Sequence, residues 1–217
     1  MFGERSVKDR EKRIFPIFEF IQSDSSHFHE IHFDVVEYIH ISPIMVYIVY
    51  MTTLSVKNTS KVFQIANYFI KKAQEENKEL TNKKLQKLLY YSQAWSVTLR
   101  DKSIFEDNIE AWVHGPAIRS VYHRFSDFGR ENLASKVDVT SAHFDEITTD
   151  DKELLNKIWE IYGKYTANDL EVISHSESPW QDAREGLEPY EASANIITIE
   201  SMKQYYGQRQ KEAKSSS

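Results

Sequence analysis

Apolar residues recur at intervals of three and four from about residue 59 onward, which is the spacing of helices that bury one face. The first stretch predicts a helix over 59–76, whose inner face is Val62, Ile65, Ala66, Phe69 and Ala73. The second predicts a helix over 82–100 with Thr81 as its N-cap. Its inner positions are Leu85, Leu88, Leu89, Ser92, Trp95 and Leu99. We expect these two helices to pack antiparallel.

The period changes to two over 107–114, which predicts a short strand instead of a helix. One side of the strand carries Ile109, Ala111 and Val113, and the other carries Glu110, Trp112 and His114. We expect Ile104 and Phe105 to pair with it as a small hairpin. Pro116 has the fixed φ of a first helical residue and therefore predicts a helix over 117–125. Residues 136–139 are a candidate for another short strand.

Capping signals mark the starts of the later helices. The three pairs are Asp150 with Glu153, Thr166 with Asp169, and Ser178 with Gln181, the last with Pro179 at the first helical position. The first pair opens a helix to Tyr162, closed by Gly163, and its inner face is Leu154, Leu155, Ile158, Ile161 and Tyr162. The second opens a helix over 167–175. The fold class is therefore mainly α, a compact helical domain with a small β-hairpin element.

The two ends of the chain differ from its middle. Residues 1–50 hold four of the eight histidines and show no sustained helical period. We hypothesise that Met51 is the natural start and that 1–50 come from an upstream start codon, or else form a poorly packed extension; a genuine N-terminal arm is the alternative. A final helix should begin near Thr198 and fade by Gly207, leaving a polar, disordered tail over 208–217. One domain over 51–207 remains.

Composition and charge exclude several classes of function. With 0 cysteines, the chain has no disulfide, thiolate zinc site, iron–sulfur cluster or cysteine nucleophile. The net charge of -6 disfavours non-specific nucleic-acid binding, and so direct DNA binding is not expected. The apolar run at 44–50 is far shorter than the roughly 20 residues of a membrane span, and no export signal is legible. We therefore expect a cytoplasmic protein that is not bound to a membrane.

Two groups of residues have the chemistry of an active or metal site, but neither has a specific spacing. His27, His29 and His32 are of a type that divalent metals bind, yet they match no known ligand pattern, and we expect no metal and no cofactor. Glu110 and His114, with His175 and Glu177, contain an acid, a base and an orienting group for a hydrolase. The typical nucleophile-elbow and phosphate-loop motifs are missing from the sequence. A non-enzymatic role is favoured, with a histidine-dependent hydrolase as an alternative.

Three lysines and a set of aromatic residues are open to two interpretations. Lys83, Lys84 and Lys87 lie in the first turns of a predicted helix, where positive charge opposes the helix dipole. They indicate a solvated face, or a surface for an acidic partner. The aromatic residues are Trp95, Trp112, Trp159, Trp180 and the pairs Tyr90-Tyr91 and Tyr205-Tyr206. Such residues fill cores, and they also anchor protein interfaces.

Several motifs in register resemble the Panacea domain family, the SocA-like, phage-associated antitoxin domain. The runs that carry the resemblance are KLQKLLYYSQAW at 84–95, IEAWVHGP at 109–116 and SHSESPW at 174–180, with Phe105, Val121-Tyr122, Phe125 and Ala183-Arg184 beside them. The resemblance covers about residues 60–207. It implies a largely helical domain with a small β element.

The resemblance also implies a function. It predicts the antitoxin of a bacterial or prophage toxin–antitoxin system, which neutralises a toxin encoded by the neighbouring gene through protein–protein interaction. Some relatives instead act as adaptors that deliver the toxin to a cytoplasmic protease, and others carry a DNA-binding module, for which 1–50 show no motif.

The motif residues are the candidates for toxin binding or for supporting the fold around it. They are Tyr90, Tyr91, Gln93, Trp95, Trp112, His114, Gly115, Pro116, Tyr122, His175, Glu177, Pro179, Trp180 and Arg184. Among them, Trp112 and His114 are on the strand face opposite Ile109 and Val113. We therefore expect these two residues at or near a groove that receives the toxin.

Overall fold

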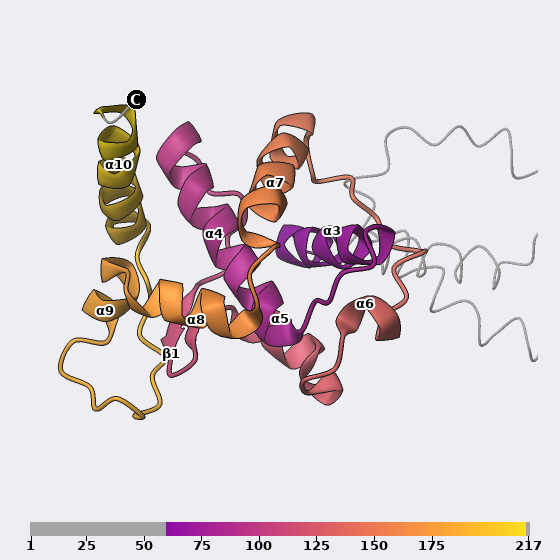
Figure 1. Cartoon of the computed structure of the whole chain (residues 1–217), viewed down its shortest axis with the longest axis horizontal. Helices are drawn as coiled ribbons and strands as arrows, with labels where there is room; N and C mark the ends of the chain where they lie inside the picture. Colours follow the sequence, from indigo (N-terminus) through magenta and orange to yellow (C-terminus); the bar gives the residue numbers. More distant parts are fainter. Residues whose placement is uncertain (1–59, 216–217) are drawn as a thin grey trace, which may run out of the picture. The chain divides into compact units, whose positions relative to one another are not determined.

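Helices dominate the part of the chain that the computed structural model describes, residues 60–215 (Figure 1). In chain order the elements are α3 (Lys61–Glu75), α4 (Asn82–Arg100), β1 (Glu110–Trp112), β2 (Gly115–Ala117), α5 (Arg119–Arg124), the 3₁₀ turn η3 (Ser126–Phe128), α6 (Leu133–Lys136), α7 (Thr149–Tyr162), α8 (Ala167–His175), α9 (Ser178–Ala183) and α10 (Ile199–Ser215). The predicted fold class, mainly α with one small hairpin, is confirmed. Among these helices, none is long and apolar enough to cross a bilayer.

Helix α4 is the centre of the fold and contacts α3, α7, α8, α10 and strand β2 (Figure 1). Its predicted range and cap are confirmed, because the Thr81 hydroxyl accepts a hydrogen bond from the Lys84 backbone N–H. Since neighbours surround the helix, its polar side chains are buried along with its leucines; they include Gln86, Lys87, Ser92, Gln93 and Ser96. Only its last turn departs from the prediction: Leu99 is 50% exposed.

Helix α3 buries the face that the sequence predicts, including Ile65 and Phe69. The expected antiparallel packing on α4 is wrong, because Figure 1 shows α3 crossing the direction of α4. Phe69 stacks on Trp159 of α7, with 6.2 Å between ring centroids. Helix α3 therefore contacts α4, α5 and α6, and it reaches α7 through Phe69.

The hairpin, which we define as residues 110–117, has a different second strand from the predicted one. Strand β1 pairs antiparallel with β2, with Ala111 opposite Pro116 and Trp112 opposite Gly115. Pro116 thus lies in a strand, and α5 begins only at Arg119. Ile104 and Phe105 do not pair with β1, because their backbone N–H groups donate to the Gln93 side chain.

The other edge of β1 is also occupied. Ala111 N–H donates to the Asn195 carbonyl and Ile197 N–H donates to the Ile109 carbonyl, each at 2.8 Å. The hairpin is therefore held between its own second strand and the segment that leads into α10. This leaves β1 without a free edge.

Capping explains the starts of α7, α8 and α9. The predicted capping box of Thr166 with Asp169 is confirmed at α8. At α7 the box is formed by Thr148 with Asp151 instead of Asp150 with Glu153. Asp151 is drawn inward by ion pairs, at 2.7 Å from Lys61 Nζ and 2.9 Å from Arg100 Nη1. Helix α9 has Pro179 in its first turn but no side-chain cap, so the predicted pairing of Ser178 with Gln181 is wrong.

Three further details differ from the sequence prediction. The candidate strand at 136–139 is wrong, because Lys136 is the last residue of the short helix α6, which Asn132 caps, and 137–139 belong to no strand. Ile161, expected on the inner face of α7, is 51% exposed. Helix α10 continues to Ser215 and does not fade by Gly207, since Tyr205 and Arg209, and Gln208 and Glu212, hydrogen-bond across successive turns.

Candidate functional site: the hairpin surface

Three buried or half-buried side chains donate hydrogen bonds to backbone carbonyls of the hairpin. Lys87 Nζ donates to the Pro116 carbonyl at 3.1 Å, Trp180 Nε1 to the Trp112 carbonyl at 2.9 Å, and Arg184 Nη1 to the Ala111 carbonyl at 3.0 Å. These donors come from α4, from α9 and from the residue that follows α9. Motif residues that lie far apart in the sequence therefore converge on the backbone of one short hairpin.

The lysines of α4 do not form the solvated face that is one interpretation of the sequence. Lys84 and Lys87 are buried, and Lys84 Nζ donates to the Gly163 carbonyl at 2.8 Å. Burial lowers the pKa of Lys84, and it lowers the pKa of Lys87 to about 7. Lys83 is partly exposed and contacts Asn168 and Glu171 of α8. The three lysines thus join α4 to the hairpin, to α8 and to the loop before it.

The outer side of the hairpin presents an aromatic group bound to a charged pair. Trp112 Nε1 donates to Glu110 at 2.6 Å, and the Arg119 guanidinium donates twice to the same carboxylate while lying over the indole, 5.3 Å from its centroid. The Tyr122 ring meets the indole edge-on at 4.9 Å. Trp112 is half-buried and Tyr122 is exposed, so this group is held in one arrangement but remains accessible.

A groove of about 680 Å³ runs beside this group. Its lining includes Trp112, His114, Gly115, Tyr122, Lys83 and Arg130. The structure thus brings Trp112 and His114 to one groove, together with Tyr122 from α5. Arg130 was not singled out in the sequence, where it stands in an irregular segment without a motif.

The predicted acid–base set is not assembled. His114 is exposed, and its Nδ1 lies 3.0 Å from Glu171 Oε1. Its partner is therefore not one of the two predicted carboxylates, Glu110 and Glu177. Burial alone would raise the pKa of Glu171, but its bonds to Lys83 and His114 outweigh burial, and the pKa is lowered. Glu110 is bound to Arg119, and Glu177 is bound to two tyrosines. Glu171 is distant from His114 in sequence and meets it only in the folded chain. The spacing of residues along the sequence therefore does not identify Glu171 as the partner of His114.

The two histidines line a second pocket, of about 480 Å³, whose lining shares His114 with the groove. His175 stacks on Trp180 with 3.9 Å between ring centroids, and burial lowers its pKa. The pocket also includes Arg184 and the loop that follows it. The pocket therefore brings together four of the motif residues, which are His114, His175, Trp180 and Arg184.

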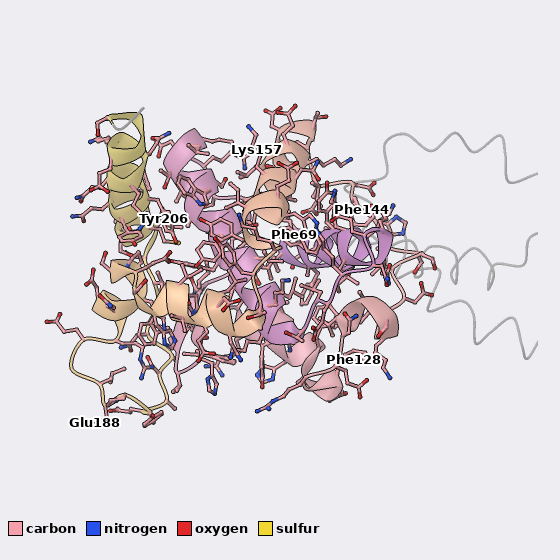
Figure 2. All side chains as sticks on the ribbon, in the orientation of Figure 1. Phe69, Phe128, Phe144, Lys157, Glu188 and Tyr206 are labelled. Atoms are coloured by element: carbon pink, nitrogen blue, oxygen red, sulfur yellow. The ribbon has the colours of Figure 1, made fainter. Side chains whose placement is uncertain are left out.

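The remaining motif residues are inside the protein. Glu177 is buried and accepts hydrogen bonds from the Tyr90 hydroxyl at 3.1 Å and the Tyr206 hydroxyl at 2.7 Å. Burial raises the pKa of Glu177 to about 7. Tyr206, labelled in Figure 2, belongs to α10, and this contact attaches α10 to α4 and to the start of α9. We call Glu177, Tyr90 and Tyr206 the carboxyl–tyrosine cluster.

Other motif side chains support this interior. Tyr91 stacks on Tyr162 with 3.9 Å between centroids, and Trp95 Nε1 donates to the Tyr162 hydroxyl at 2.9 Å. Gln93 Nε2 donates to the Phe105 carbonyl, and Pro179 is buried in α9. These residues set the positions of helices and loops, and they are not on the surface of the groove.

Within residues 60–215, no group of three histidine or acidic side chains could hold a metal ion. The candidate ligands His27, His29 and His32 lie outside the described residues, as does the hypothesised start at Met51.

Comparison with known proteins finds a family whose model matches part of this chain. The family model described as "Antitoxin SocA-like, Panacea domain" matches residues 85–181, from α4 to α9, which include the hairpin. Antitoxin SocA of Caulobacter vibrioides (strain NA1000 / CB15N) is 29% identical over 124 residues, which are 54% of this chain and 66% of that relative. This chain therefore spans slightly less than two thirds of the relative's length. No solved structure gives a significant match.

Proposed function

Because residues 85–181 carry the SocA-like Panacea domain that the motifs predict, we propose that this protein is an antitoxin that neutralises a toxin by direct, stoichiometric binding. The family match and the similarity to Antitoxin SocA support an antitoxin role, and an antitoxin has a toxin as its partner. We propose 51–207 as the neutralising domain and the hairpin surface as its contact site.

One observation carries the choice of surface: buried or half-buried side chains hydrogen-bond to the backbone of the hairpin, and the hairpin presents an aromatic side chain to the groove. Its backbone is bound by Lys87, Trp180 and Arg184, while Trp112 stands beside an open groove. A tryptophan and an arginine held in place before binding lose little conformational entropy when a partner covers them. Such residues typically supply most of the affinity of a protein interface. The rest of the groove then needs only to be complementary in shape.

The proposed function is tested by co-expression with the product of the adjacent gene. We expect the wild-type protein to restore growth and to be recovered in a stable complex with that product. The double substitution His114→Gln with His175→Gln should still restore growth, because no imidazole chemistry is required. Disappearance of the toxin from the cell would instead favour delivery to a protease. Rescue at substoichiometric levels that depends on the histidines would favour a hydrolase.

Replacing Trp112 by alanine should weaken binding to the adjacent gene product by about 30-fold, the effect of a central interface residue. The fold should persist, since Trp112 lies at the surface of a hairpin whose backbone is bound separately. Calorimetric titration measures the affinity, and circular dichroism checks the fold. Leu99→Ala is the matched control, because Leu99 is an exposed apolar residue near the end of α4. Equal affinities for the two variants would remove the hairpin from the interface.

A further inference from the structure

The loop that follows α9 has an arginine inside it. We define the Arg184 loop as residues 184–191, which lie between α9 and α10 (Figure 1). Figure 2 shows Glu188 at the outer limit of this loop, away from the helices. The loop belongs to no helix or strand, yet it forms one wall of the second pocket. It therefore extends the hairpin surface beyond His114.

Arg184 holds this loop in one shape. Its side chain is buried, and Nη2 donates to the carbonyls of Glu191 at 2.8 Å and Glu188 at 3.2 Å, while Nη1 reaches the hairpin. The guanidinium also lies over the Trp180 ring, 5.3 Å from its centroid. A buried cation must have its donors satisfied, and here backbone carbonyls satisfy them only if the loop curls around the arginine. The loop is thus organised before any partner arrives.

This organised loop exposes an aromatic residue. Tyr190 is 90% exposed, although it lines the same pocket as the His175–Trp180 stack. A large aromatic side chain gains nothing for folding in this position. On a loop whose shape is already fixed, it is suited to anchor a partner, because tyrosine has few rotatable bonds to immobilise.

The charges on and beside the loop have one sign. The exposed carboxylates are Asp182, Glu185, Glu188 and Glu191. Arg184 is the only basic residue between 182 and 191, and it is buried. The outer surface is therefore acidic and complementary to a cationic partner. Tyr190 offers a ring face on which a guanidinium stacks favourably.

We propose that the Arg184 loop binds a basic segment of the toxin, with Tyr190 stacking on an arginine of that segment and Glu185 and Glu188 pairing with its positive charges. The inference rests on the proposed function and adds the chemistry of the partner. The groove beside Trp112 and the second pocket beside Tyr190 then form two parts of one contact surface that meet at His114.

Two variants of the full chain test the proposal against the purified product of the adjacent gene. Tyr190→Ala should weaken binding by about 30-fold. Glu185→Lys with Glu188→Lys should weaken it by about 100-fold at low salt, and the difference from wild type should shrink in high salt. The matched control is Glu153→Lys with Glu160→Lys, which makes the same change in net charge on exposed sites of α7, well apart from the loop in Figure 1.

The outcomes separate this proposal from the proposed function. All three variants should keep the wild-type unfolding temperature, because every substituted side chain is exposed. If the wild-type protein binds the gene product and the loop variants bind as tightly as the α7 control, the Arg184 loop is not the contact and only this proposal is overturned. If the charge variant of the loop and the charge variant of α7 lose affinity equally, the loss comes from the net charge of the protein. The proposal that the loop is the contact is then overturned as well. If the wild type does not bind at all, direct neutralisation fails and this proposal fails with it.

Discussion

Replacing Gly115 with alanine is expected to lower the free energy of unfolding by about 3 kcal/mol, the sum of backbone strain and overpacking. Gly115 has φ +91, which favours glycine. A Cβ at this position would lie 2.7 Å from Lys87 Cε and 2.9 Å from Ser174 Oγ. The lysine has no room to retreat, because its amine is bound to the next carbonyl of the same hairpin. Unfolding in urea measures the loss.

Gly129→Ala separates the two contributions. Gly129 also has a positive φ, +54, but apart from its two chain neighbours no atom of the described residues lies within 4 Å of the Cβ that alanine would add. It should therefore lose only about 1 to 2 kcal/mol, from the backbone alone. Equal losses for the two substitutions would mean that Lys87 and Ser174 are not packed against the hairpin turn. The buried support of the hairpin would then be wrong.

Elements that depend on neighbours in sequence were predictable. Thr81 and Thr166 cap helices because each hydroxyl reaches an N–H three residues ahead, whatever the rest of the fold does. The inner face of α3 follows from spacing in the same way. At α7, however, the predicted box of Asp150 with Glu153 was wrong, and Thr148 with Asp151 forms it. Asp151 is also held by ion pairs with Lys61 and Arg100, both distant in sequence, which spacing does not reveal.

Features that depend on tertiary contacts were not predictable. Lys87 resembles a surface residue in sequence, but α4 is covered on most sides and its amine finds a carbonyl of the hairpin. Glu177 was selected by the motif, yet its partners are tyrosines of α4 and α10 and not a histidine. Trp112 and His114 were singled out in the sequence and line the candidate groove, whereas Arg184 is the only residue of the Arg184 loop that the motifs pointed to. Lys87, Glu177 and Arg184 are all buried, and the spacing of residues along the sequence does not encode which polar side chains will be buried.

The stability of the protein should pass through a minimum near pH 7, and the carboxyl–tyrosine cluster causes the acidic side of this minimum. Burial raises the pKa of Glu177 from 4.5 to about 7. Between these values the folded protein keeps a proton that the unfolded chain releases, so stability is full below pH 4.5 and is lost as the pH rises through 7. At roughly 1.4 kcal/mol for each pH unit, the loss is about 3 kcal/mol.

Lys87 causes the alkaline side, with the opposite sign. Burial lowers its pKa from 10.5 to about 7. Between these values the unfolded chain holds a proton that the folded protein has released, so stability rises as the pH increases from 7 toward 10.5. The two effects do not overlap, because one ends where the other begins. Their sum is a valley in the free energy of unfolding.

Two substitutions should each remove one side of this valley. In Glu177→Gln no carboxyl titrates, so the free energy of unfolding should no longer fall between pH 4.5 and 7, while the alkaline rise remains. In Lys87→Met the alkaline rise should disappear and the acidic fall should persist. Glu153→Gln is the control, since this exposed glutamate should leave the profile unchanged. Urea unfolding across this pH range measures all four proteins. A Glu177→Gln profile that falls as steeply toward pH 7 as the wild-type profile would mean that Glu177 takes up no proton on folding. The tyrosine hydroxyls would then be stabilising a buried negative charge between α4 and α10.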